Sequence, residues 1–352
     1  MTIQENVLLA PYTTFRIGGA ARFFVCVRSV EDVVEACDFA HGKNPLGKNL
    51  PIFVLGGGSN ILVSDDGFDG LVIKNEIKGV SFNESYTKKG ESNRDCEIKV
   101  GSGENWDALV SVAVEKGLHG LENLSWIPGT VGAAPVQNIG AYGTEAGNLI
   151  SEVEFYDGAA GAALGPQTIK GSKCNFGYRD SIFKHELKHV IITAVTFKLK
   201  KNSIVDIEYK DLKNYFDNKG VVPTLQDVRE AVIEIRKSKL PDLTKYGTAG
   251  SFFKNAVISK SDSVKLVEKY PGIPVFVVDD GSVKVPTAWI LDNICGFKGA
   301  RRGTVGVYEN QALVLVNLGG AKATDIKNLA AEMIDSVKQK TGITISPEVE
   351  LV

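Results

Sequence analysis

The feature that most limits what this chain can fold into is a run of glycines placed between two strands. Residues 51–55 (PIFVL) have the composition of a buried strand, and residues 61–63 and 71–73 resume strand composition beyond the glycines. The loop between them consists of Gly56, Gly57, Gly58, Ser59 and Asn60. Consecutive glycines let backbone N–H groups converge on an anion, and serine and asparagine add donors. A pyrophosphate-binding loop and a plain turn fit this pattern equally well.

The same loop departs from the two common nucleotide-binding fingerprints. A Rossmann domain has G-x-G-x-x-G at the start of a helix, whereas strand residues follow these glycines. The G-x-x-x-x-G-K-[ST] loop is also missing from the sequence. A Rossmann or P-loop domain is therefore not predicted.

Length and composition indicate a protein of several domains. A single hydrophobic core stops growing near roughly 250–300 residues, and this chain has 352. Hydrophobic residues make up 43% and charged residues 23%, which is ordinary for a folded protein. A formal net charge of −2 without Lys/Arg-rich blocks argues against a general nucleic-acid binder. We expect two or three domains and no nucleic-acid partner.

The N-terminus and the cysteines point to a reducing compartment. Residues 1–15 show no basic leader followed by an apolar core, and no apolar run reaches the roughly 18 residues of a spanning helix. The cysteines form no C-x-x-C pair and lie far apart, at Cys26, Cys37, Cys96, Cys174 and Cys295. We expect a cytoplasmic location, no membrane insertion, free buried thiols and no metal site.

Helix and strand signals alternate along the chain. Capping residues and amphipathic spacing predict helices after Ser29 and over residues 105–116, 224–239, 263–269, 287–294 and 323–340. Further strands are predicted over residues 97–100, 152–156, 190–198 and 312–316. Residues 83–94 are predicted as a loop and residues 158–165 as a hairpin tip. A domain boundary is expected near Leu240, because Pro241 ends the preceding helix.

A glycine- and proline-rich stretch covers residues 120–143 and is too apolar for a linker. Pro128, Gly129 and Gly140 would let a flat ring lie against the backbone, and the amides of Gln137 and Asn138 could bond its polar edge. Long structured loops of this kind are commonly functional. A structural loop packed under a helix would look similar.

The segment FGYRDSIFK at residues 176–184 carries a candidate anion-binding arginine. Arg179 is flanked by Tyr178 and Asp180, with apolar residues on either side. A guanidinium can bond a carboxylate or oxyanion at two places. The alternative is an arginine paired with Asp180 in a surface turn.

Two further segments carry candidate proton-transfer groups. Ser251 lies on a glycine-flanked turn that is not a G-x-S-x-G elbow, and no histidine follows His189. Ser251 could still give up a proton if Lys254 or Arg179 stabilised the alkoxide; a turn or N-cap serine is the alternative. Glu348, near the C-terminus, would be solvated unless the tail folds back onto the core.

Taken together and in order, eight segments resemble the UDP-N-acetylenolpyruvoylglucosamine reductase family, flavoenzymes of peptidoglycan precursor synthesis. They are TTFRIGG, VLGGGSN, GSGENWDALV, GLENLSWIPGTVGAAPVQNIGAYG, FGYRDSIFK, RKSKLPD, GSFFKN and PEV. The resemblance implies an α+β fold: two FAD-binding domains of the vanillyl-alcohol-oxidase type, then a C-terminal α+β substrate domain of the longer, type I form. The implied boundaries are 1–78 with 342–352, 79–236 and 237–341.

The resemblance implies reduction of UDP-N-acetylglucosamine enolpyruvate to UDP-N-acetylmuramate by NADPH through non-covalent FAD. The hydride goes to C3, and the charge that develops on C2 and the carboxylate calls for cations and a proton. By position in the family motifs, Ser251 gives the proton to C2, while Arg179 and Glu348 stabilise the carboxylate. Glu348 can do so only if it is protonated or shares a proton. The resemblance also implies that nicotinamide occupies the substrate cleft in turn and that the protein is a monomer of the bacterial cytoplasm.

The resemblance also assigns the binding residues. The FAD contacts implied are Gly56, Gly57, Gly58, Ser59, Asn60, Ile127, Pro128, Gly129, Ala133, Gln137, Asn138, Gly140 and Arg236. The substrate contacts implied are Tyr142, Tyr178, Tyr209, Lys239, Asn255 and Lys298.

Two positions depart from the family pattern. Phe276 stands where long-form relatives have a tyrosine that closes over the nucleotide, and phenylalanine can stack but cannot donate a hydrogen bond. Glu350 stands where members often carry arginine, which reverses a charge near the flavin edge.

Two other readings remain at this point. One is a flavin oxidase or dehydrogenase for another small alcohol or acid, and the other is a UDP-sugar-binding regulatory protein without catalysis. The joint presence of Arg179, Ser251 and Glu348 weighs against the first. Retention of Ser251 and the glycine loop weighs against the second.

Overall fold

The computed structural model describes residues 1–84, 95–158, 165–201, 203–278 and 281–352. The chain divides into two compact units. The first contains Met1–Val7, Ala21–Gly57 and Asp69–Arg236, and the second contains Leu8–Ala20, Gly58–Phe68 and Lys237–Val352. The division into three domains at the boundaries given above stays a prediction.

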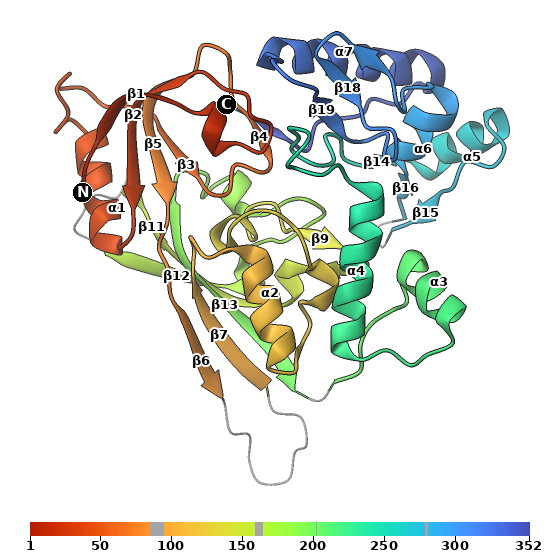
Figure 1. Cartoon of the computed structure of the whole chain (residues 1–352), viewed down its shortest axis with the longest axis horizontal. Coiled ribbons are helices and arrows are strands. Elements are labelled where there is room, and N and C mark those ends of the chain that lie inside the picture. The colour runs from red at the N-terminus through yellow and green to blue at the C-terminus, as the bar shows by residue number, and fades with distance from the viewer. Residues whose placement is uncertain (85–94, 159–164, 202, 279–280) are drawn as a thin grey trace. The chain divides into compact units, whose positions relative to one another are not determined.

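A four-stranded sheet opens the first unit, with α1 (Val30–Ala40) beside it (Figure 1). Its strands are β1 (Gln4–Leu8), β2 (Ala20–Val27), β5 (Phe68–Asn75) and β3 (Ile52–Leu55), in that spatial order. β3 and β5 are parallel, with Leu55 opposite Lys74. Ser29 accepts the Asp32 N–H, so the predicted helix start is confirmed. Apolar residues of α1, β2 and β5 form one core between them.

A larger sheet of six strands forms the rest of the first unit's framework. Its order is β12 (Pro166–Lys170), β11 (Ile150–Tyr156), β13 (Ile191–Lys201), β7 (Asp95–Gly101) and β6 (Val80–Glu84), and β8 (Leu118–His119) also pairs with β13. These pairs are antiparallel. The strands predicted over 97–100, 152–156 and 190–198 are confirmed within a few residues.

The loop predicted over residues 83–94 is partly wrong. Asn83 and Glu84 belong to β6, where they pair with Glu97 and Cys96 of β7. Polar side chains do not prevent this, because a strand needs only backbone partners on its edge. Residues 85–94 lie outside the described residues, as do 159–164 of the predicted hairpin tip. β11 and β12, which flank that tip, pair antiparallel with Tyr156 opposite Pro166.

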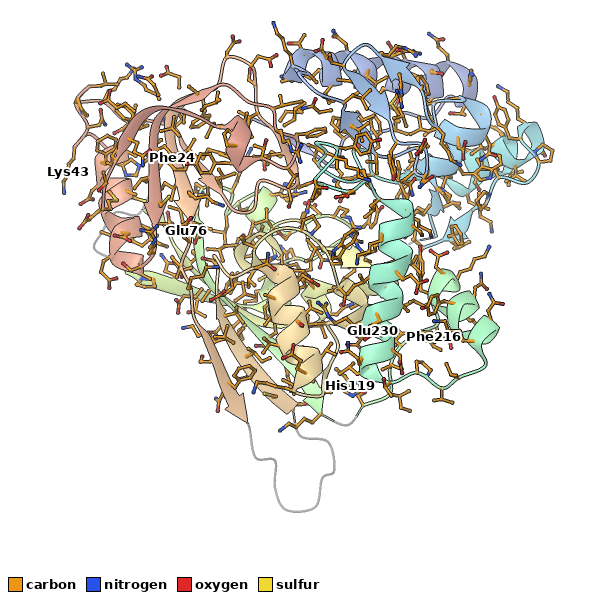
Figure 2. All side chains as sticks on the ribbon, viewed as in Figure 1. Phe24, Lys43, Glu76, His119, Phe216 and Glu230 are labelled. Carbon is orange, nitrogen blue, oxygen red and sulfur yellow. The ribbon has the colours of Figure 1, made fainter. Side chains whose placement is uncertain are left out.

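Three helices complete the first unit. α2 (Trp106–Glu115) begins at the cap Asn105, as predicted, and buries Trp106. α4 (Leu225–Lys239) begins at a full capping box, in which Thr224 and Asp227 bond each other's backbone N–H. α3 (Lys210–Lys219) was not predicted, because its residues are largely polar. Figure 2 labels Phe216 of α3, which packs on α4 in a small core, and Glu230, which is exposed on α4.

The second unit is built from short strands around one long helix. β4 (Ile61–Leu62) pairs in parallel with β20 (Glu350–Leu351), so the C-terminal tail does fold back onto the early part of the chain. β14 (Ala256–Ile258), β16 (Val283–Val285) and β15 (Phe276–Val277) form one sheet, in that order. β17 (Arg301–Arg302), β18 (Val305–Val307) and β19 (Leu315–Asn317) form another.

The helices of this unit are α5 (Lys260–Lys269), α6 (Thr287–Trp289) and α7 (Ala323–Thr341). The helix predicted over 323–340 is thus confirmed, and the one predicted over 263–269 begins earlier, after its cap Ser259. The prediction over 287–294 is only partly right, because residues Ile290–Ile294 continue α6 as a π-helix. Residues of these helices and of the short strands share a single core.

The strand predicted over residues 312–316 is wrong at its start. Ala312 and Leu313 lie in a turn, and the strand begins at Leu315. Ala312 is nevertheless 2% exposed. Apolar composition reports burial, and it does not separate a buried turn from a buried strand.

The remaining regular structure is short. β9 (Gly140–Ala141) and β10 (Thr144–Glu145) pair with each other. Turns of 3₁₀-helix cover Ala10–Tyr12, Glu122–Leu124, Val131–Ala133, Ala146–Asn148, Gly171–Lys173 and Ile182–Lys184. No cysteine forms a disulfide, as predicted, but the predicted burial is right only for Cys37, Cys96 and Cys174, because Cys26 and Cys295 are partly exposed. No helix within the described ranges is long and apolar enough to cross a bilayer.

Asp65 ties the early part of the second unit to α7. Its carboxylate accepts the N–H groups of Ala323 and Thr324 at 2.7 and 3.0 Å, and the Thr324 hydroxyl at 2.8 Å. Burial raises the pKa of Asp65, but these hydrogen bonds and the charge of Lys322 outweigh it, so the pKa is lowered. A carboxylate 258 residues away in sequence therefore caps the first turn of α7.

We expect Asp65→Ala to lower the free energy of unfolding by about 1 kcal/mol at neutral pH, the usual cost of a lost cap. The contribution should be complete above the unfolded aspartate pKa of about 3.9 and vanish as the pH falls through the lower folded-state pKa. Urea unfolding of both proteins across this range measures it. Asp66→Ala is the control, because the Asp66 carboxylate accepts no hydrogen bond from the described residues. Equal losses in both variants would contradict the capping role.

Candidate functional site

The glycine loop touches the proline-rich loop directly within the first unit. A Cβ atom on Gly57 would lie 2.6 Å from the Cα of Gly129, and one on Gly56 would lie 2.6 Å from Oγ1 of Thr130. Backbone therefore packs on backbone, which only glycine allows. Two segments that the sequence singled out separately, at 56–57 and 127–130, form one surface.

Lys74 supports this loop from the neighbouring strand. Its ammonium group donates to the carbonyl oxygen of Gly56. The register of β3 and β5 brings it there, because Lys74 lies opposite Leu55. Burial lowers the pKa of Lys74 and Lys78 adds to this, against the opposing effect of Glu76 and Cys26. Nothing in the sequence motif marked Lys74.

The glycine loop fits an anion. Gly58 has a φ of 63°, and a Cβ there would lie 2.0 Å from the carbonyl oxygen of Tyr12. The backbone N–H groups of Gly57 and Gly58 donate to no acceptor in the described part of the chain. Since buried amides normally have partners, these two are suited to a phosphate oxygen.

Asn138 is committed to holding its own loop. Its φ is 45°, and it is 1% exposed. Its amide donates to Glu145 and Gly177 at 2.7 and 3.0 Å and accepts the Gly147 N–H at 2.8 Å. Both amide hydrogens of its side chain are therefore used within the protein. The amide shapes the loop by joining residue 138 to the turn that carries Arg179.

Arg179 sits at the tip of a tight turn in a left-handed conformation, with a φ of 56°. Gly177 and Asp180 exchange backbone hydrogen bonds at 3.0 and 3.2 Å to close this turn. The guanidinium donates to the carbonyl of Gly140 at 2.7 Å and lies 5.5 Å from the ring centroid of Tyr178. A non-glycine residue held at positive φ is strained, which is common at functional sites.

The surface-turn alternative for Arg179 is not what the structure shows. Asp180 instead bonds His185 at 2.9 Å. Burial raises the pKa of Asp180, but that bond, the charges of His185 and Lys184 and the Ser181 N–H outweigh it, so the pKa is lowered.

Three predicted tyrosines and two arginines of the first unit form one cluster. The rings of Tyr142 and Tyr209 meet edge to face, with centroids 5.4 Å apart. Burial raises the pKa of Tyr142 to about 12, against the opposing charge of Arg236. Arg236 in turn interacts with Tyr142 and Arg179, and Tyr209 with Tyr178. The structure therefore groups the substrate tyrosines predicted for this unit with Arg179 and Arg236.

In the second unit, Ser251 and Glu348 lie on adjacent segments. The Phe252 carbonyl accepts the N–H of Glu348 at 2.8 Å, and the Lys254 N–H donates to Ser346 at 3.0 Å. Ser251 itself bridges to Val314. The hydroxyl of Ser251 makes no hydrogen bond to the described residues, so it is available to a ligand.

Asn60 joins the same group. Its amide donates to the backbone oxygen of Glu348 at 3.2 Å, and its own backbone oxygen accepts the N–H of Glu350 at 3.0 Å. The pairing of β4 with β20 continues this contact. Residues 60, 251 and 348, which are far apart in sequence, are thus neighbours.

Other predicted substrate residues of the second unit have structural partners. The Asn255 side chain accepts the N–H of Thr287 at 3.1 Å, at the start of α6. Lys298 pairs with Asp292 at 2.8 Å, and both are more than one-third exposed. Lys239 is the last residue of α4.

Comparison with known proteins identifies the family. A model described as UDP-N-acetylenolpyruvoylglucosamine reductase, C-terminal domain, matches residues 242–352, and an FAD binding domain model matches residues 21–164. The enzyme of that name from Ralstonia nicotianae is 42% identical over 348 residues, 98% of each chain, and that from Chromobacterium violaceum is 41% identical over 354 residues, 99% of each. This chain belongs to the UDP-N-acetylenolpyruvoylglucosamine reductase family.

A solved structure agrees with this assignment. The crystal structure of UDP-N-acetylenolpyruvylglucosamine reductase (MurB) from Thermus caldophilus aligns with a TM-score of 0.66 and 26% identity, covering 99% of both chains. The predicted fold class is confirmed as α+β, with an FAD-binding domain and the C-terminal domain of the reductase family. The vanillyl-alcohol-oxidase type of the FAD-binding fold stays a prediction.

The two departures from the reductase family pattern are both at the surface. Phe276 lies in the edge strand β15 and is 54% exposed. Asp280, through which it was aligned with the loop-closing tyrosine, lies outside the described residues. Glu350 is exposed on β20. The closing role of position 276 stays a prediction.

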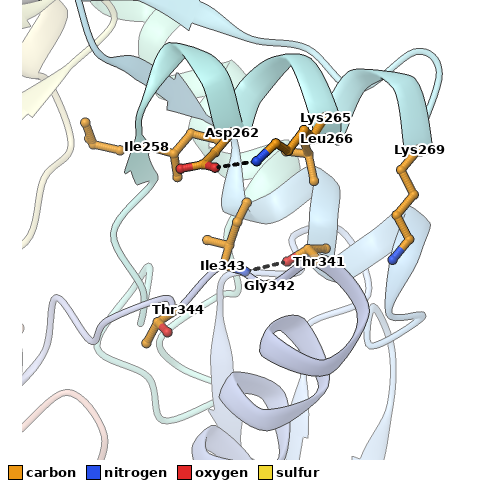
Figure 3. A pocket seen from close by; sticks show the side chains of 10 residues that line it. Ile258, Asp262, Lys265, Leu266, Lys269, Thr341, Gly342, Ile343 and Thr344 are labelled. Carbon is orange, nitrogen blue, oxygen red and sulfur yellow. Dashed lines mark hydrogen bonds and ion pairs between the residues drawn. The ribbon is translucent and has the colours of Figure 1, made fainter.

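A pocket of about 450 Å³ in the second unit has no part in the predicted reductase site (Figure 3). It is lined by residues of β14 and α5, by Thr341 at the end of α7 and by the following residues 342–344. Its two lysines are engaged, Lys265 with Asp262 at 3.8 Å and Lys269 with the Lys340 carbonyl at 2.8 Å. None of the predicted site residues lines it.

Proposed function

We propose that this chain reduces the enolpyruvyl group of UDP-N-acetylglucosamine enolpyruvate with NADPH, giving UDP-N-acetylmuramate for peptidoglycan synthesis. The proposal is carried by the 42% sequence identity to a reductase of that name, which extends over 98% of both chains. The adjacent positions of the segments that hold Ser251 and Glu348 support it. When bound, FAD supplies hydride transfer from the nicotinamide to C3 of the enolpyruvyl group.

Ser251 is the proton donor to C2. Its hydroxyl is not engaged by the described residues, and the turn that carries it is anchored by the buried Phe252 and Phe253. A donor held still in this way loses little freedom when the substrate arrives. Glu348, one segment away, acts on the substrate carboxylate in its protonated or proton-sharing form.

Arg179 is the cation that stabilises charge developing on the carboxylate. The closed turn, the bond to Gly140 and the ring of Tyr178 fix its position. A preorganised charge of this kind acts without reorganisation at the moment of reaction. Tyr142, Tyr178, Tyr209, Lys239, Asn255 and Lys298 are proposed to contact the substrate.

The residues present fit FAD. The amides of Gly57 and Gly58 suit the pyrophosphate, and Ser59 and Asn60 add polar groups beside them. The remaining contacts are proposed to come from Ile127, Pro128, Gly129, Ala133, Gln137, Asn138, Gly140 and Arg236. The protein is proposed to act as a cytoplasmic monomer, with three domains at 1–78 with 342–352, 79–236 and 237–341.

The deciding experiment reduces the purified yellow protein with NADPH without oxygen, then adds the enolpyruvyl substrate and follows flavin absorbance. Return of the oxidised spectrum supports both half-reactions. Bleaching that persists would point to another acceptor, as in a flavin oxidase or dehydrogenase. A protein that holds no flavin would leave the UDP-sugar-binding protein.

Lys74→Met tests the support under the glycine loop. Loss of a charged donor to the Gly56 carbonyl should weaken FAD binding about tenfold or more, since such bonds are worth about 1.5–3 kcal/mol. Fluorescence titration of the apoprotein with FAD measures this. Lys43→Met is the matched control: Lys43, labelled in Figure 2, pairs with Asp38 at the surface, 73% exposed. An unchanged dissociation constant for Lys74→Met would remove Lys74 from the cofactor site.

A further inference from the structure

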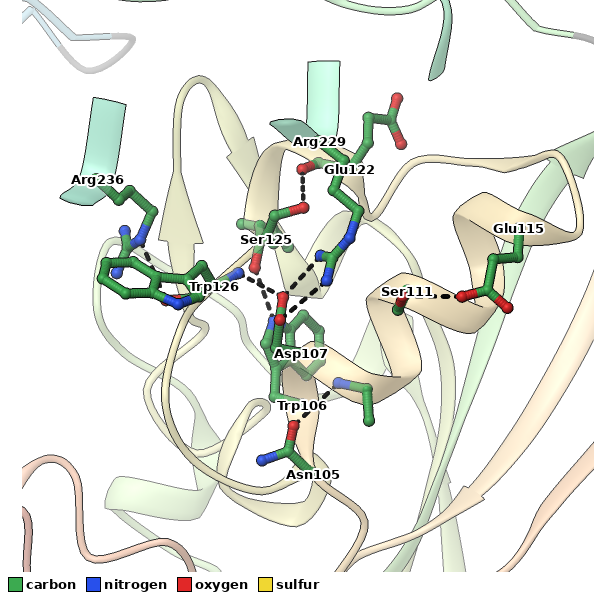
Figure 4. A network of polar contacts seen from close by, with 12 residues as sticks. Asn105, Trp106, Asp107, Ser111, Glu115, Glu122, Ser125, Trp126, Arg229 and Arg236 are labelled. Atoms are coloured by element: carbon green, nitrogen blue, oxygen red, sulfur yellow. Dashed lines mark hydrogen bonds and ion pairs between the residues drawn. The ribbon is translucent and has the colours of Figure 1, made fainter. Parts of the chain in front are cut away.

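A charged network holds the residue that precedes the predicted flavin loop (Figure 4). Asp107, in the first turn of α2, accepts the backbone N–H of Trp126 at 2.5 Å. The same carboxylate binds Arg229 of α4 through two bonds, at 2.7 and 2.9 Å. Arg229 is 9% exposed. This paired geometry is the strong form of an arginine–carboxylate contact.

Trp126 is held from its other side as well. The Nε of Arg236 donates to the backbone oxygen of Trp126 at 3.3 Å. Arg229 and Arg236 are seven residues apart on α4 and so share one face of the helix. Figure 4 shows Asp107 and Arg236 on either side of Trp126. Both peptide groups of one residue are therefore held by charged side chains.

Trp126 needs this support, because its φ of 60° lies in the left-handed region. A bulky residue there is strained and persists only where its surroundings impose it. The next three residues, 127–129, are the predicted flavin contacts. Gly129 is held from the same helix end, since its carbonyl accepts the Trp106 N–H at 3.1 Å. The strained residue, Trp126, thus directly precedes the loop segment 127–129.

Electrostatics favour the charged form of the Asp107 carboxyl group. Burial raises the pKa of Asp107, but the hydrogen bonds from Arg229 and Trp126 and the charges of Arg229 and Arg236 outweigh it, so the pKa is lowered. Arg236, which is partly buried and interacts with Tyr142 and Arg179, gains a nearby negative charge from Asp107. The Asp107 carboxylate therefore interacts with two arginines and with one backbone N–H group.

We propose that Asp107 and Arg229 are positioning residues for the cofactor: their ion pair sets the conformation of Trp126 and thereby presents residues 127–129 to FAD. The inference rests on the proposed function only for the identity of the cofactor. Neither residue needs to touch FAD. Neither residue was predicted as a site residue from the sequence.

The test titrates apoprotein with FAD, at a temperature well below the unfolding midpoint of each variant, and records the visible circular dichroism of the bound flavin. Asp107→Asn keeps the shape but loses the charge, and should raise the FAD dissociation constant about thirtyfold, equivalent to about 2 kcal/mol, with an altered flavin spectrum. Asp69→Asn is the matched control in the same unit. Asp69 pairs with Arg22 at 2.8 Å but is 77% exposed, so its variant should bind FAD within twofold of wild type.

A second variant guards against misfolding. Arg229→Lys keeps the charge but cannot form the paired contact, and should weaken FAD binding at least fivefold. If Asp107→Asn or Arg229→Lys lowers the unfolding temperature while the dissociation constant stays within twofold, the pair only stabilises the fold and the proposal is overturned. If wild-type protein binds FAD but does not reduce the enolpyruvyl substrate, the proposed function is wrong. The role of Asp107 and Arg229 in FAD binding can then still be tested. Wild-type protein that binds no FAD overturns both.

Discussion

Replacing Ser251 with alanine is expected to slow reoxidation of the flavin by the enolpyruvyl substrate by about a hundredfold or more, the usual effect of losing a general acid. Bleaching of the flavin by NADPH should stay near the wild-type rate, because no proton from Ser251 is needed in that half. Anaerobic stopped-flow absorbance measures the two halves separately. The rates of the two half-reactions are expected to differ because Ser251 acts at a single atom, C2 of the substrate.

The control for this prediction is Ser259→Ala in the same unit. Ser259 accepts the Asp262 N–H at 3.1 Å as the N-cap of α5. Its loss should cost about 1 kcal/mol of stability and leave both rates unchanged. Equal slowing of both halves in Ser251→Ala, together with reduced stability, would make Ser251 a turn serine like Ser259 and would sink its role as proton donor.

Arg179→Lys is expected to slow the substrate half-reaction by about 10²-fold, the scale of losing one preorganised charge contact. Lysine keeps the charge, but it presents a point charge on a flexible stem and cannot bond a carboxylate at two places. It also cannot hold the Gly140 carbonyl and the substrate with one rigid group. Single-turnover rates against substrate concentration separate the loss of rate from weaker binding.

Arg22→Lys provides the comparison for this variant. Arg22 donates one hydrogen bond to Asp69, lies over the ring of Phe23 and has a side chain that is 38% exposed, so its variant should behave as wild type. If Arg179→Lys only raises the substrate concentration needed for half-maximal rate and leaves the limiting rate unchanged, Arg179 binds the ground state and does not stabilise charge in the transition state.

Some secondary-structure elements could be predicted from the sequence and others could not. The helix starts at Ser29, Asn105 and Thr224 were predictable because a cap bonds an N–H two or three residues away. The strand residues around the glycine loop were predictable from composition. α3 was missed because only Leu212 and Phe216 are buried in it, too few to make a visible apolar stripe.

The candidate site divides in the same way. Motifs marked Arg179, Ser251 and Glu348, since each stands in a distinctive local segment. Lys74, Asp107 and Arg229 were missed, because an isolated lysine, aspartate or arginine is usually a surface residue. The only signal available in the sequence was their place beside marked segments: Asp107 in GSGENWDALV and Arg229 on the helix that carries Arg236.

The sequence by itself determined the family, the fold class and the residue types of the reaction, because local motifs and their order are written along the chain. Tertiary structure decided which groups meet. Asp107 and Arg229 are 122 positions apart, and Asn60 and Glu348 are 288 apart. Contacts over such separations depend on strand register and on how helices pack. A local cap such as Ser29, by contrast, depends only on residues within one turn of its own helix.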